Sequence, residues 1–460
     1  MPSDENAPLM GSKPKHWSNV KKRTMFTRTV IALALLFGVA GGVAWFTKAT
    51  SSTGGGGDTN DPDFSSLRGF CDDIEAIQPS EYLERHARLA ETLPEGGALV
   101  MEPGPTMLYY TNIEWSLSER PFLVVLQRAA NSTITTTVVT PMFEATRALE
   151  AIQEAKLPME ISIKVVEWIE HGSPYETTAE LLEEASHVFV EPGVRLFVYD
   201  GLADILSQQH GVVTTMASRA LQTLRMVKSP AEIAIMRCAN RATVAAAKKV
   251  RHHVKPGMTE ADIASLVTQA LTAAGLTNTW VLALVDENAA FPHGEPGATK
   301  RVTKHSTVLI DSGGELLGYQ SDVTRTFFMD NGDRNSHNQT IVDAWYLVKS
   351  AQQAVLHDAH AGSTCAEVDL AARHVIDRAG YGRYFTHRLG HGIGEEMHEE
   401  PYMNQGNTHI KLQPGMTFSV EPGIYITHEF GIRLEDIVVV TKDGNLELLT
   451  DSLADNPWTL

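Results

Sequence analysis

The sequence predicts a two-domain α/β protein that follows a single N-terminal transmembrane helix. Three observations support this fold class. Residues 29–47 carry no charge, residues 64–224 alternate between strand-like and helical runs, and a strong helix start near Ser229 opens a second domain. A chain of 460 residues, 43% of them hydrophobic, is long enough to form two globular cores after such a helix.

The apolar N-terminal run predicts a membrane anchor. The segment IALALLFGVAGGVAWF lies between Arg28 and Lys48, and at about 1.5 Å per residue it is long enough to cross a bilayer core of ~30 Å. Residues 1–28 are mainly basic, whereas residues 48–63 are Gly-rich and acidic. The charge asymmetry therefore predicts a type II protein with a cytoplasmic N-terminus, a helix at 29–47 and a flexible linker at 48–63.

A cleaved signal peptide, followed by secretion, is the alternative. Small residues at 38–44 offer a cleavage point, but the polar segment before the run is long and the run exceeds the usual core of about 7–15 residues. Either topology places the remainder of the chain in the lumen or outside the cell. The triplets that begin at Asn131 and Asn338 match the N-glycosylation pattern and predict a glycoprotein.

Charge and cysteine content exclude several classes of function. The chain has 56 acidic against 38 basic residues, a net charge of −18, which argues against nucleic acid and anionic membrane surfaces as partners of the folded part. Cys71, Cys238 and Cys365 form neither a catalytic triad nor a Cys-x-x-Cys pair. Their odd number predicts no disulfide framework, and we expect all three to be small packing residues.

The first domain is predicted at residues 64–224. Its strand-like runs are 99–104, 121–128, 133–140 and 187–200, and its helical runs are 81–93, 144–155 and 178–187. Alternation of this kind is typical of an α/β domain.

A second domain is predicted at residues 225–455. Ser229 is suited to cap a helix whose first residue is Pro230, and Glu232 completes a capping box. Residues 256–263 and 361–368 share the order Gly, Thr, acidic residue and aliphatic residue, so each is expected to begin a helix. This faint internal repeat could come from capping chemistry alone or from two related halves.

Five motifs in the last third of the chain each centre on one residue that can bind a metal. The motifs read VLIDSG, SDVTRTF, HRLGHGIG, SVEPG and IRLEDIVV, and the residues are Asp311, Asp322, His391, Glu421 and Glu435. Four carboxylates and one imidazole suit Mn²⁺, Co²⁺, Fe²⁺ or Zn²⁺ rather than a thiolate-bound structural zinc. Because one divalent ion neutralises only half of the four negative charges, the set predicts two ions.

Local patterns indicate how these residues are presented. The apolar run before Asp311 predicts a buried strand that ends at this aspartate. The strand period of two places Arg433 and Glu435 on one face. Glycines around His391 argue against a helical zinc pair formed with His387.

The ordered motifs resemble those of the pita-bread metallopeptidases, which include prolidase (Xaa-Pro dipeptidase), aminopeptidase P and, more distantly, methionine aminopeptidase. The resemblance covers about residues 63–451. It implies an α+β pita-bread catalytic domain at 225–455. The segment at 102–112 resembles the non-catalytic, creatinase-like α/β domain that precedes it in prolidases, and this domain at 64–224 separates the chain from the short methionine aminopeptidases.

The resemblance also implies roles for the ligands. Asp311 would bind one ion, His391 and Glu421 would bind the other, and Asp322 and Glu435 would bridge the two. Mn²⁺ is the expected metal, with Co²⁺, Zn²⁺ or Fe²⁺ as alternatives. The pair would acidify a shared water and turn it into the nucleophile.

Four further residues match the family outside the ligand set. His293 in FPHGEP and His398 in MHE resemble the histidines that lie over the substrate and steady the tetrahedral intermediate or move a proton. His387 and Arg433 would support the ligands or orient the substrate.

The implied activity is hydrolysis of small peptides with proline in the second position, by a homodimeric Xaa-Pro dipeptidase or aminopeptidase P. The choice between dipeptidase and aminopeptidase stays open, because it depends on how loops and a neighbouring subunit close the cleft. The alternative is a non-peptidase member of the same fold, such as a metal-dependent lyase or hydrolase of a small metabolite. Retention of all five ligands argues against a metal-free binding protein.

Overall fold

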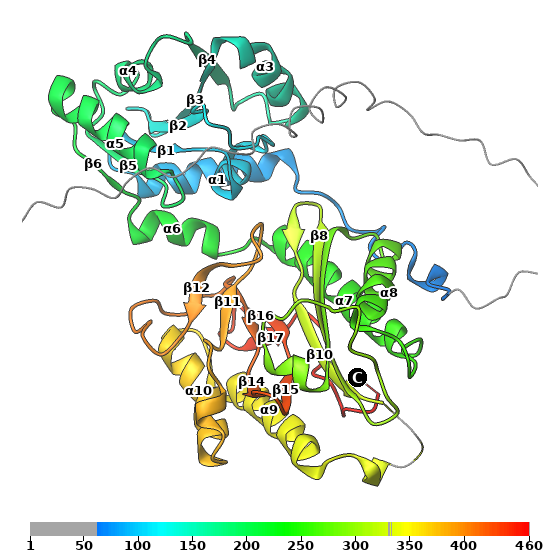
Figure 1. The fold of residues 1–460 in the computed structure, drawn as a ribbon. Helices are drawn as coiled ribbons and strands as arrows, with labels where there is room; N and C mark the ends of the chain where they lie inside the picture. The colour runs from blue at the N-terminus through cyan, green and yellow to red at the C-terminus, as the bar shows by residue number, and fades with distance from the viewer. Residues whose placement is uncertain (1–61, 330–331, 333, 460) are drawn as a thin grey trace, which may run out of the picture. The chain divides into compact units, whose positions relative to one another are not determined.

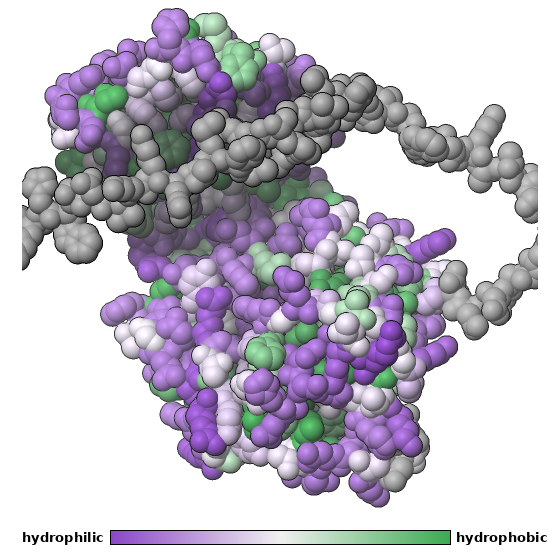
Figure 2. Space-filling model, viewed as in Figure 1, coloured by the Kyte–Doolittle hydropathy of each residue, from purple (hydrophilic) through white to green (hydrophobic). Residues whose placement is uncertain are grey.

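The computed structural model describes residues 62–329, 332 and 334–459, and residues 61–460 form one compact unit. The predicted anchor at 29–47, the basic segment before it and most of the linker lie outside the described residues. Among the helices of the described residues, none combines the length and apolar character needed to cross a bilayer. The face in Figure 2 is mainly hydrophilic, with hydrophobic residues scattered across it.

A six-stranded mixed sheet forms the centre of the N-terminal part (Figure 1). The strand order is β4-β3-β2-β1-β5-β6, with antiparallel pairing only at β1–β2 and β2–β3. The strands are β1 (Gly97–Met101), β2 (Leu123–Arg128), β3 (Ile134–Pro141), β4 (Ile163–Trp168), β5 (His187–Val190) and β6 (Thr214–Met216). The helices are α1 (Pro79–Thr92), α2 (Pro105–Thr111), α3 (Ala145–Glu154), α4 (Pro174–Glu180), α5 (Leu196–Ile205) and α6 (Arg219–Met226).

Both faces of this sheet are buried. Leu99 and Met101 of β1 pack with α1 and α3 in one core, whereas Ala98 and Val100 pack with α4 and α5 in another. Successive residues of a strand point to opposite faces, so the near-continuous apolar runs of the sequence match a sheet with helices on both sides. The predicted α/β arrangement is confirmed for this part of the chain.

Two predicted elements of this part are wrong in extent. The strand-like run at 187–200 is a strand only as far as Val190; a turn follows, and α5 begins at Leu196. Pro192 and Gly193 interrupt the run, and Glu102 holds the backbone N–H and the guanidinium of Arg195 just before the helix. The helix expected at 178–187 is α4, which begins earlier and ends at Glu180. Strands β4 and β6 were not predicted.

The C-terminal part contains two helix pairs and two main sheets. Strands β10-β8-β7 form one sheet, with β9 paired to β8; strands β12-β11-β13-β16-β17 form the other, and β14 and β15 form a hairpin. The helices are α7 (Pro230–Arg251), α8 (Glu260–Ala273), α9 (Gln339–Asp358) and α10 (Cys365–Arg378). The strands are β7 (Thr277–Val285), β8 (Thr307–Leu316), β9 (Tyr319–Gln320), β10 (Val323–Phe328), β11 (Gly390–Gly392), β12 (Glu399–Met403), β13 (Thr417–Val420), β14 (Gly423–Ile426), β15 (Phe430–Arg433), β16 (Asp436–Val440) and β17 (Leu446–Leu448).

The faint internal repeat of the sequence is a repeat in the structure. Thr259 and Thr364 each cap their helix, α8 and α10, with a complete capping box. Each follows a glycine in the left-handed region, Gly257 at φ +97° and Gly362 at φ +95°, which L side chains rarely adopt. Each Thr also forms an antiparallel β-bridge to a later segment. The two segments therefore share backbone conformation as well as capping, which favours two related halves.

Each half packs its helices on its own sheet (Figure 1). Ala242 of α7 and Val267 of α8 join Ile310 of β8 in one core. Trp345 of α9 joins Phe418 of β13 in the other. The predicted start of α7 is confirmed, with a capping box at Ser229. The expected domain boundary at 224–225 falls within α6.

The cysteine prediction is wrong for two residues of three. Cys71 and Cys238 form a disulfide that joins the segment before α1 to α7. The two residues are 167 positions apart, so only the fold brings them together. Cys365 is a free, buried thiol in the core of the second half, as predicted.

Candidate metal centre

The five predicted ligands converge from different strands of the two halves. Asp311 lies on β8 and Asp322 directly precedes β10; His391 lies on β11, Glu421 directly follows β13, and Glu435 directly precedes β16. Together with His398, their ligand atoms form overlapping groups of three in which all atoms lie within 4.8 Å of one another. No helix carries any of the five, which confirms that His387 and His391 are not a helical pair.

Two of the strand predictions need correction. Asp311 lies inside β8 rather than at its end, because the strand continues through Gly313, where a Cβ would lie 1.8 Å from the carbonyl oxygen of Ser321. Arg433 and Glu435 do not share one strand, because β15 ends at Arg433 and β16 begins after Glu435. Sequence periodicity alone does not reveal either the close approach at the glycine or the break between the strands.

Arg433 and Glu435 nevertheless meet at one hydroxyl group. Arg433 Nε donates to Thr324 Oγ1 at 2.9 Å, and Thr324 Oγ1 donates to Glu435 Oε2 at 2.7 Å. Arg433 Nη2 also donates to Asp311 Oδ2 at 2.6 Å. The guanidinium therefore orients two of the carboxylates, one directly and one through Thr324.

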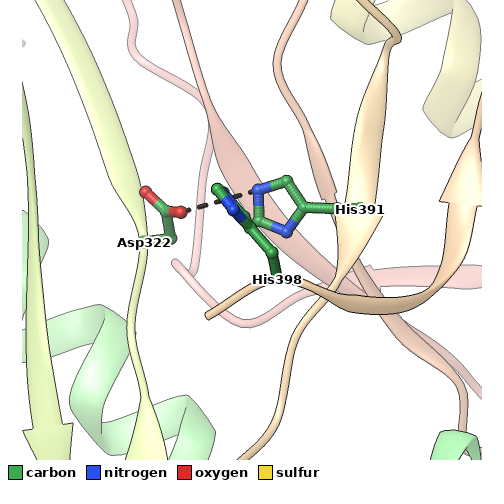
Figure 3. A group of neighbouring side chains, drawn as sticks. All are labelled: Asp322, His391 and His398. Carbon is green, nitrogen blue, oxygen red and sulfur yellow. Dashed lines mark ion pairs between the residues drawn. The ribbon is translucent and has the colours of Figure 1, made fainter. Parts of the chain in front are cut away.

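His391 presents one ring nitrogen to the carboxylates. Its Nε2 lies 3.6 Å from Asp322 Oδ2 and 3.4 Å from Glu421 Oε1, while Nδ1 lies 3.1 Å from the carbonyl oxygen of Gly392. A proton on Nδ1 would be donated to that carbonyl, which leaves the Nε2 lone pair free for a metal. Figure 3 shows this ring between Asp322 and the strand that carries it, with His398 close by.

The carboxylates repel one another in a buried site. Burial raises the pKa of Asp322 and of Glu435 well above the usual range, and the charges of neighbouring carboxylates add to both shifts. Burial also raises the pKa of Glu421, to about 7. Burial lowers the pKa of His391 to about 3, so the imidazole is neutral at physiological pH. Without cations, burial disfavours the ionised carboxylates and keeps the imidazole neutral. Bound cations would therefore stabilise the ionised form of the carboxylates.

The donor set fits divalent metal ions. Asp311 Oδ1 and Asp322 Oδ1 are buried oxygens without a hydrogen-bond partner. Leaving such oxygens unpaired costs about 1–3 kcal/mol each, and no side-chain donor of the described residues satisfies them. Hard oxygen ligands around one neutral imidazole match Mn²⁺, Co²⁺, Fe²⁺ or Zn²⁺.

Comparison with known proteins agrees with this reading. Residues 234–442 match the model of metallopeptidase family M24. An uncharacterized peptidase of Schizosaccharomyces pombe is 39% identical over 83% of this chain and 84% of its own length. The crystal structure of dipeptidase PepE from Mycobacterium ulcerans has a TM-score of 0.73 at 31% identity and covers 84% of this chain and 100% of that one.

The chain belongs to metallopeptidase family M24. An Xaa-Pro dipeptidase of Lactobacillus helveticus is also 39% identical, over 50% of this chain and 62% of its own length. These relatives and the family match establish the chain as a metallopeptidase with a pita-bread fold.

The predicted substrate-side residues of this M24 peptidase surround the ligands. The rings of His391 and His398 lie edge to face, with centroids 4.1 Å apart. His387 Nε2 and Tyr425 Oη lie 2.9 Å apart, and Arg433 Nη1 donates to the same oxygen at 2.9 Å. Arg433 Nη1 also donates to the carbonyl of Pro292, directly before the exposed His293, at 3.3 Å.

Burial lowers the pKa of both inner histidines. The pKa of His387 falls to about 3, with the positive charge of Arg433 as the second cause. The pKa of His398 is also lowered, mainly by partial burial and then by the positive charge of Arg388. Both rings are therefore neutral at physiological pH, and each is able to donate and accept a proton.

No sequence motif indicated the cations that hold the loop before His398. Arg85 of α1, 1% exposed, lies 3.7 Å from Glu395 and 3.5 Å from Glu232. Arg225 pairs with Glu396, and Lys228 pairs with Glu399. The loop of this M24 peptidase that carries His398 is thus fixed by the N-terminal part and by the connection into α7. Tyr425 and Thr324 were missed as well, since neither stands out from ordinary strand residues.

Proposed function

We propose that this metallopeptidase hydrolyses Xaa-Pro peptide bonds with two bound divalent ions. The observation that carries the proposal is the group of four carboxylates, three buried and one partly buried, around one neutral imidazole, with two carboxylate oxygens left unpartnered. The Xaa-Pro dipeptidase among the relatives supports the choice of substrate. The second candidate is a metal-dependent lyase or hydrolase of a small metabolite, which the same ligand set would serve.

The ligand roles follow the position of each side chain. Asp311 would hold one ion, and His391 and Glu421 would hold the other. Asp322 and Glu435 would bridge both ions, since each of them lies close to Asp311 and also close to His391. Mn²⁺ is the proposed metal, with Co²⁺, Zn²⁺ or Fe²⁺ as alternatives. When bound, the ions supply Lewis acidity and an acidified water for attack on the scissile carbonyl.

The chain's own residues then handle protons and orientation. His398 is neutral and partly open to solvent, so its ring nitrogen is able to donate a hydrogen bond to the oxygen that becomes negative as the carbonyl is attacked. The proline nitrogen that leaves must gain a proton, and the exposed His293 would supply it by exchange with solvent. The contacts among His387, Tyr425 and Arg433 keep the wall of the site rigid.

Proline after the scissile bond suits such a rigid site. Its ring fixes φ near about −65°, and the peptide nitrogen carries no hydrogen that the site must satisfy. A pocket without an acceptor for that hydrogen therefore prefers proline over alanine by shape and by avoidance of an unpaired donor.

A hydrolysis assay with the purified protein and Mn²⁺ tests the proposal. Ala-Pro and a longer Xaa-Pro peptide are expected to be cleaved, and an Ala-Ala control is expected to be cleaved far more slowly. Equal cleavage of the proline and alanine substrates would remove the proline specificity. Failure of a fully metallated protein on all three peptides would favour the small-metabolite alternative.

We also propose a type II membrane topology with the peptidase in the lumen or outside the cell, and glycosylation at Asn131 and Asn338. Both asparagines are exposed, as a sequon must be for modification. The Cys71–Cys238 disulfide supports an oxidising compartment, because cytosolic thiols are kept reduced. Secretion after signal cleavage is the alternative, and a homodimer is proposed on the family resemblance.

Protease protection on intact microsomes tests the topology. The catalytic part should resist protease added from the cytoplasmic side, and endoglycosidase should increase the gel mobility of the native chain but not of a chain with both Asn131→Gln and Asn338→Gln. Digestion from the cytoplasmic side would contradict the orientation. A mature N-terminus near Gly41 would show cleavage, and light scattering would give the oligomeric state.

A further inference from the structure

Glu260 is a buried carboxylate outside the metal centre. It is the first residue of α8, directly after the capping Thr259, and its exposed fraction is 0%. Its Oε1 accepts from the backbone N–H of Val285 at 2.8 Å and from Asn288 Nδ2 at 2.9 Å, and its Oε2 accepts from the backbone N–H of Gly297 at 2.9 Å. Hydrogen bonds from amide groups and the N-terminal end of a helix both stabilise such a buried anion. One side chain therefore joins two separate segments of the chain.

The two segments are the ends of the loop that carries His293. This loop connects β7 to β8, and Val285 is the last residue of β7. Beyond Gly297, Arg301 forms an antiparallel β-bridge with Thr259, so the start of α8 also holds the chain that follows the loop. His293 lies between the two attachments and is exposed.

The first part of this loop also contacts β15. A Cβ at Gly431 would lie 1.7 Å from the carbonyl oxygen of Ala289, so the two backbones approach closely there. Arg433 of the same strand donates to the carbonyl of Pro292 at 3.3 Å. The loop that presents His293 is thus held by the start of α8 and by the strand that carries Arg433.

We propose that Glu260 positions His293, so that this histidine is able to protonate the proline nitrogen that leaves. The inference rests on the proposed function and deepens it, because it names the residue that keeps the proton donor in place. As the bond between the scissile carbon and the proline nitrogen breaks, the nitrogen takes a proton from the His293 ring, and the ring regains one from solvent. Such a donor acts only within hydrogen-bond reach, and a displacement of about 1 Å is able to lower the rate about 100-fold.

The first experiment replaces one acceptor oxygen of Glu260 and keeps the size of the side chain. Glu260→Gln accepts with one oxygen only, and its NH₂ group faces an N–H that had an acceptor, so one attachment of the loop is lost. The Mn²⁺-loaded variant should show a kcat on Ala-Pro about 10–100-fold lower, with KM and Mn²⁺ content unchanged. A raised KM at unchanged kcat, or a loss of Mn²⁺, would show a general structural role and overturn the proposal.

Lys300→Gln is the matched control, because it removes a contact of the same loop at its surface. Lys300 Nζ lies 2.6 Å from Glu287 Oε2, and both side chains are partly exposed to solvent. Ion pairs of this kind contribute little to stability, so kcat should stay unchanged. An equal fall in kcat for Lys300→Gln and Glu260→Gln would overturn the specific role of the buried carboxylate.

A double variant shows whether Glu260 acts through His293. His293→Ala alone should lower kcat, because the proton donor is lost. In that background, Glu260→Gln should lower kcat less than about twofold further, since the two residues act as one unit. If the two losses multiply, or if His293→Ala leaves kcat unchanged, the proposal fails.

Asn288→Leu removes a contact to Glu260 from the side of the loop. It deletes one donor and leaves the start of α8 unaltered, so it tests the proposal if Glu260→Gln does not fold. The variant should again lower kcat at unchanged KM. An unchanged kcat in the folded Asn288 variant would contradict the positioning role.

Amide hydrogen exchange separates this inference from the proposed function. In the Mn²⁺-loaded protein, Glu260→Gln should speed exchange at residues 285–297 about tenfold or more, while exchange in the middle of α8 stays the same. Lys300→Gln should leave both regions unchanged. If no Xaa-Pro peptide is hydrolysed, the proposed function fails, yet exchange still decides whether Glu260 holds the loop: unaltered exchange at residues 285–297 overturns it.

Discussion

Two buried groups of charged side chains in this peptidase are arranged in opposite ways. Around Arg85 a cation stands at the centre: it donates to Glu81 at 3.1 Å, to the carbonyl of Tyr109 at 2.7 Å and to Tyr319 Oη at 3.1 Å. Around His391 the anions stand at the centre, with the guanidinium of Arg433 to one side.

The difference lies in what satisfies the carboxylates. In the Arg85 group, Glu232 accepts from Tyr319 Oη at 3.0 Å and from the backbone N–H of Ser229 at 2.7 Å, so protein donors hold it. In the metal centre, one oxygen of Asp311 and one of Asp322 have no donor. Glu232 is therefore satisfied by the chain, whereas Asp311 and Asp322 each leave one oxygen open for what the centre binds. In the Arg85 group the unpartnered buried atoms are Arg85 Nε and Glu395 Oε2.

Glu395 in the Arg85 group shows a third solution. Burial raises its pKa to about 8, and the opposing effect of Arg85 does not cancel the cost of desolvation. This carboxyl group is therefore neutralised by a proton over much of the physiological range, without a metal.

The largest expected effect on activity comes from removing a carboxylate of the metal centre. Asp322→Asn should lower activity more than about 100-fold, beyond the usual effect of removing a group outside the ligand set, and should lower the Mn²⁺ content measured by elemental analysis. Asp358→Asn, at an exposed carboxylate of α9, is the control and should change neither. Full activity of the Asp322 variant without bound metal would refute the two-ion site.

His398 comes next. His398→Ala should lower kcat by about 10²–10⁴-fold, the range for a group that transfers protons or stabilises charge, while metal content stays normal. His409→Ala, at an exposed histidine further along the same stretch, should leave kcat unchanged. Loss of metal in the His398 variant would instead make His398 a ligand, since its ring lies within reach of Asp322 and His391.

Removing the cation of the Arg85 group should mainly lower the stability of the fold. Arg85→Met leaves buried carboxylates without their cation and should lower the free energy of unfolding by about 3–5 kcal/mol, with a fall in kcat because Glu395 lies three residues before His398. Metal content of the folded protein should be retained. Arg88→Met, on the same helix, removes one hydrogen bond to Tyr109 Oη and should cost only about 1 kcal/mol. If denaturant unfolding showed the same loss of unfolding free energy for both variants, this difference would be contradicted.

The smallest effect concerns pH. The pKa of Glu395 is about 8 in the folded chain against 4.5 as its ordinary value, so the folded state binds more protons between these pH values and its stability falls as pH rises. Glu395→Gln removes this loss and should gain about 3 kcal/mol relative to the unaltered protein between pH 5 and pH 8. Exposed Glu183→Gln is the control; parallel profiles for all three proteins would show that Glu395 is ionised.

Much of the fold was predictable because local chemistry determined it. Ser229, Thr259 and Thr364 cap their helices as their motifs indicate, since each cap involves residues only three positions apart. The α/β part followed from hydrophobic periodicity, but the run at 187–200 misled because a Pro-Gly turn separates a strand from a helix of similar composition.

By itself the sequence determined which residues carry chemistry: the five motifs name the carboxylates and the imidazole that the structure brings together. The tertiary structure decided their surroundings. The Cys71–Cys238 disulfide, the contact of Arg85 with Glu395 and the stacking of Arg388 on Tyr402 depend on contacts between segments that no local pattern links. Motifs report the chemical identity of a side chain, whereas burial, pairing and the absence of a partner are properties of the space around it.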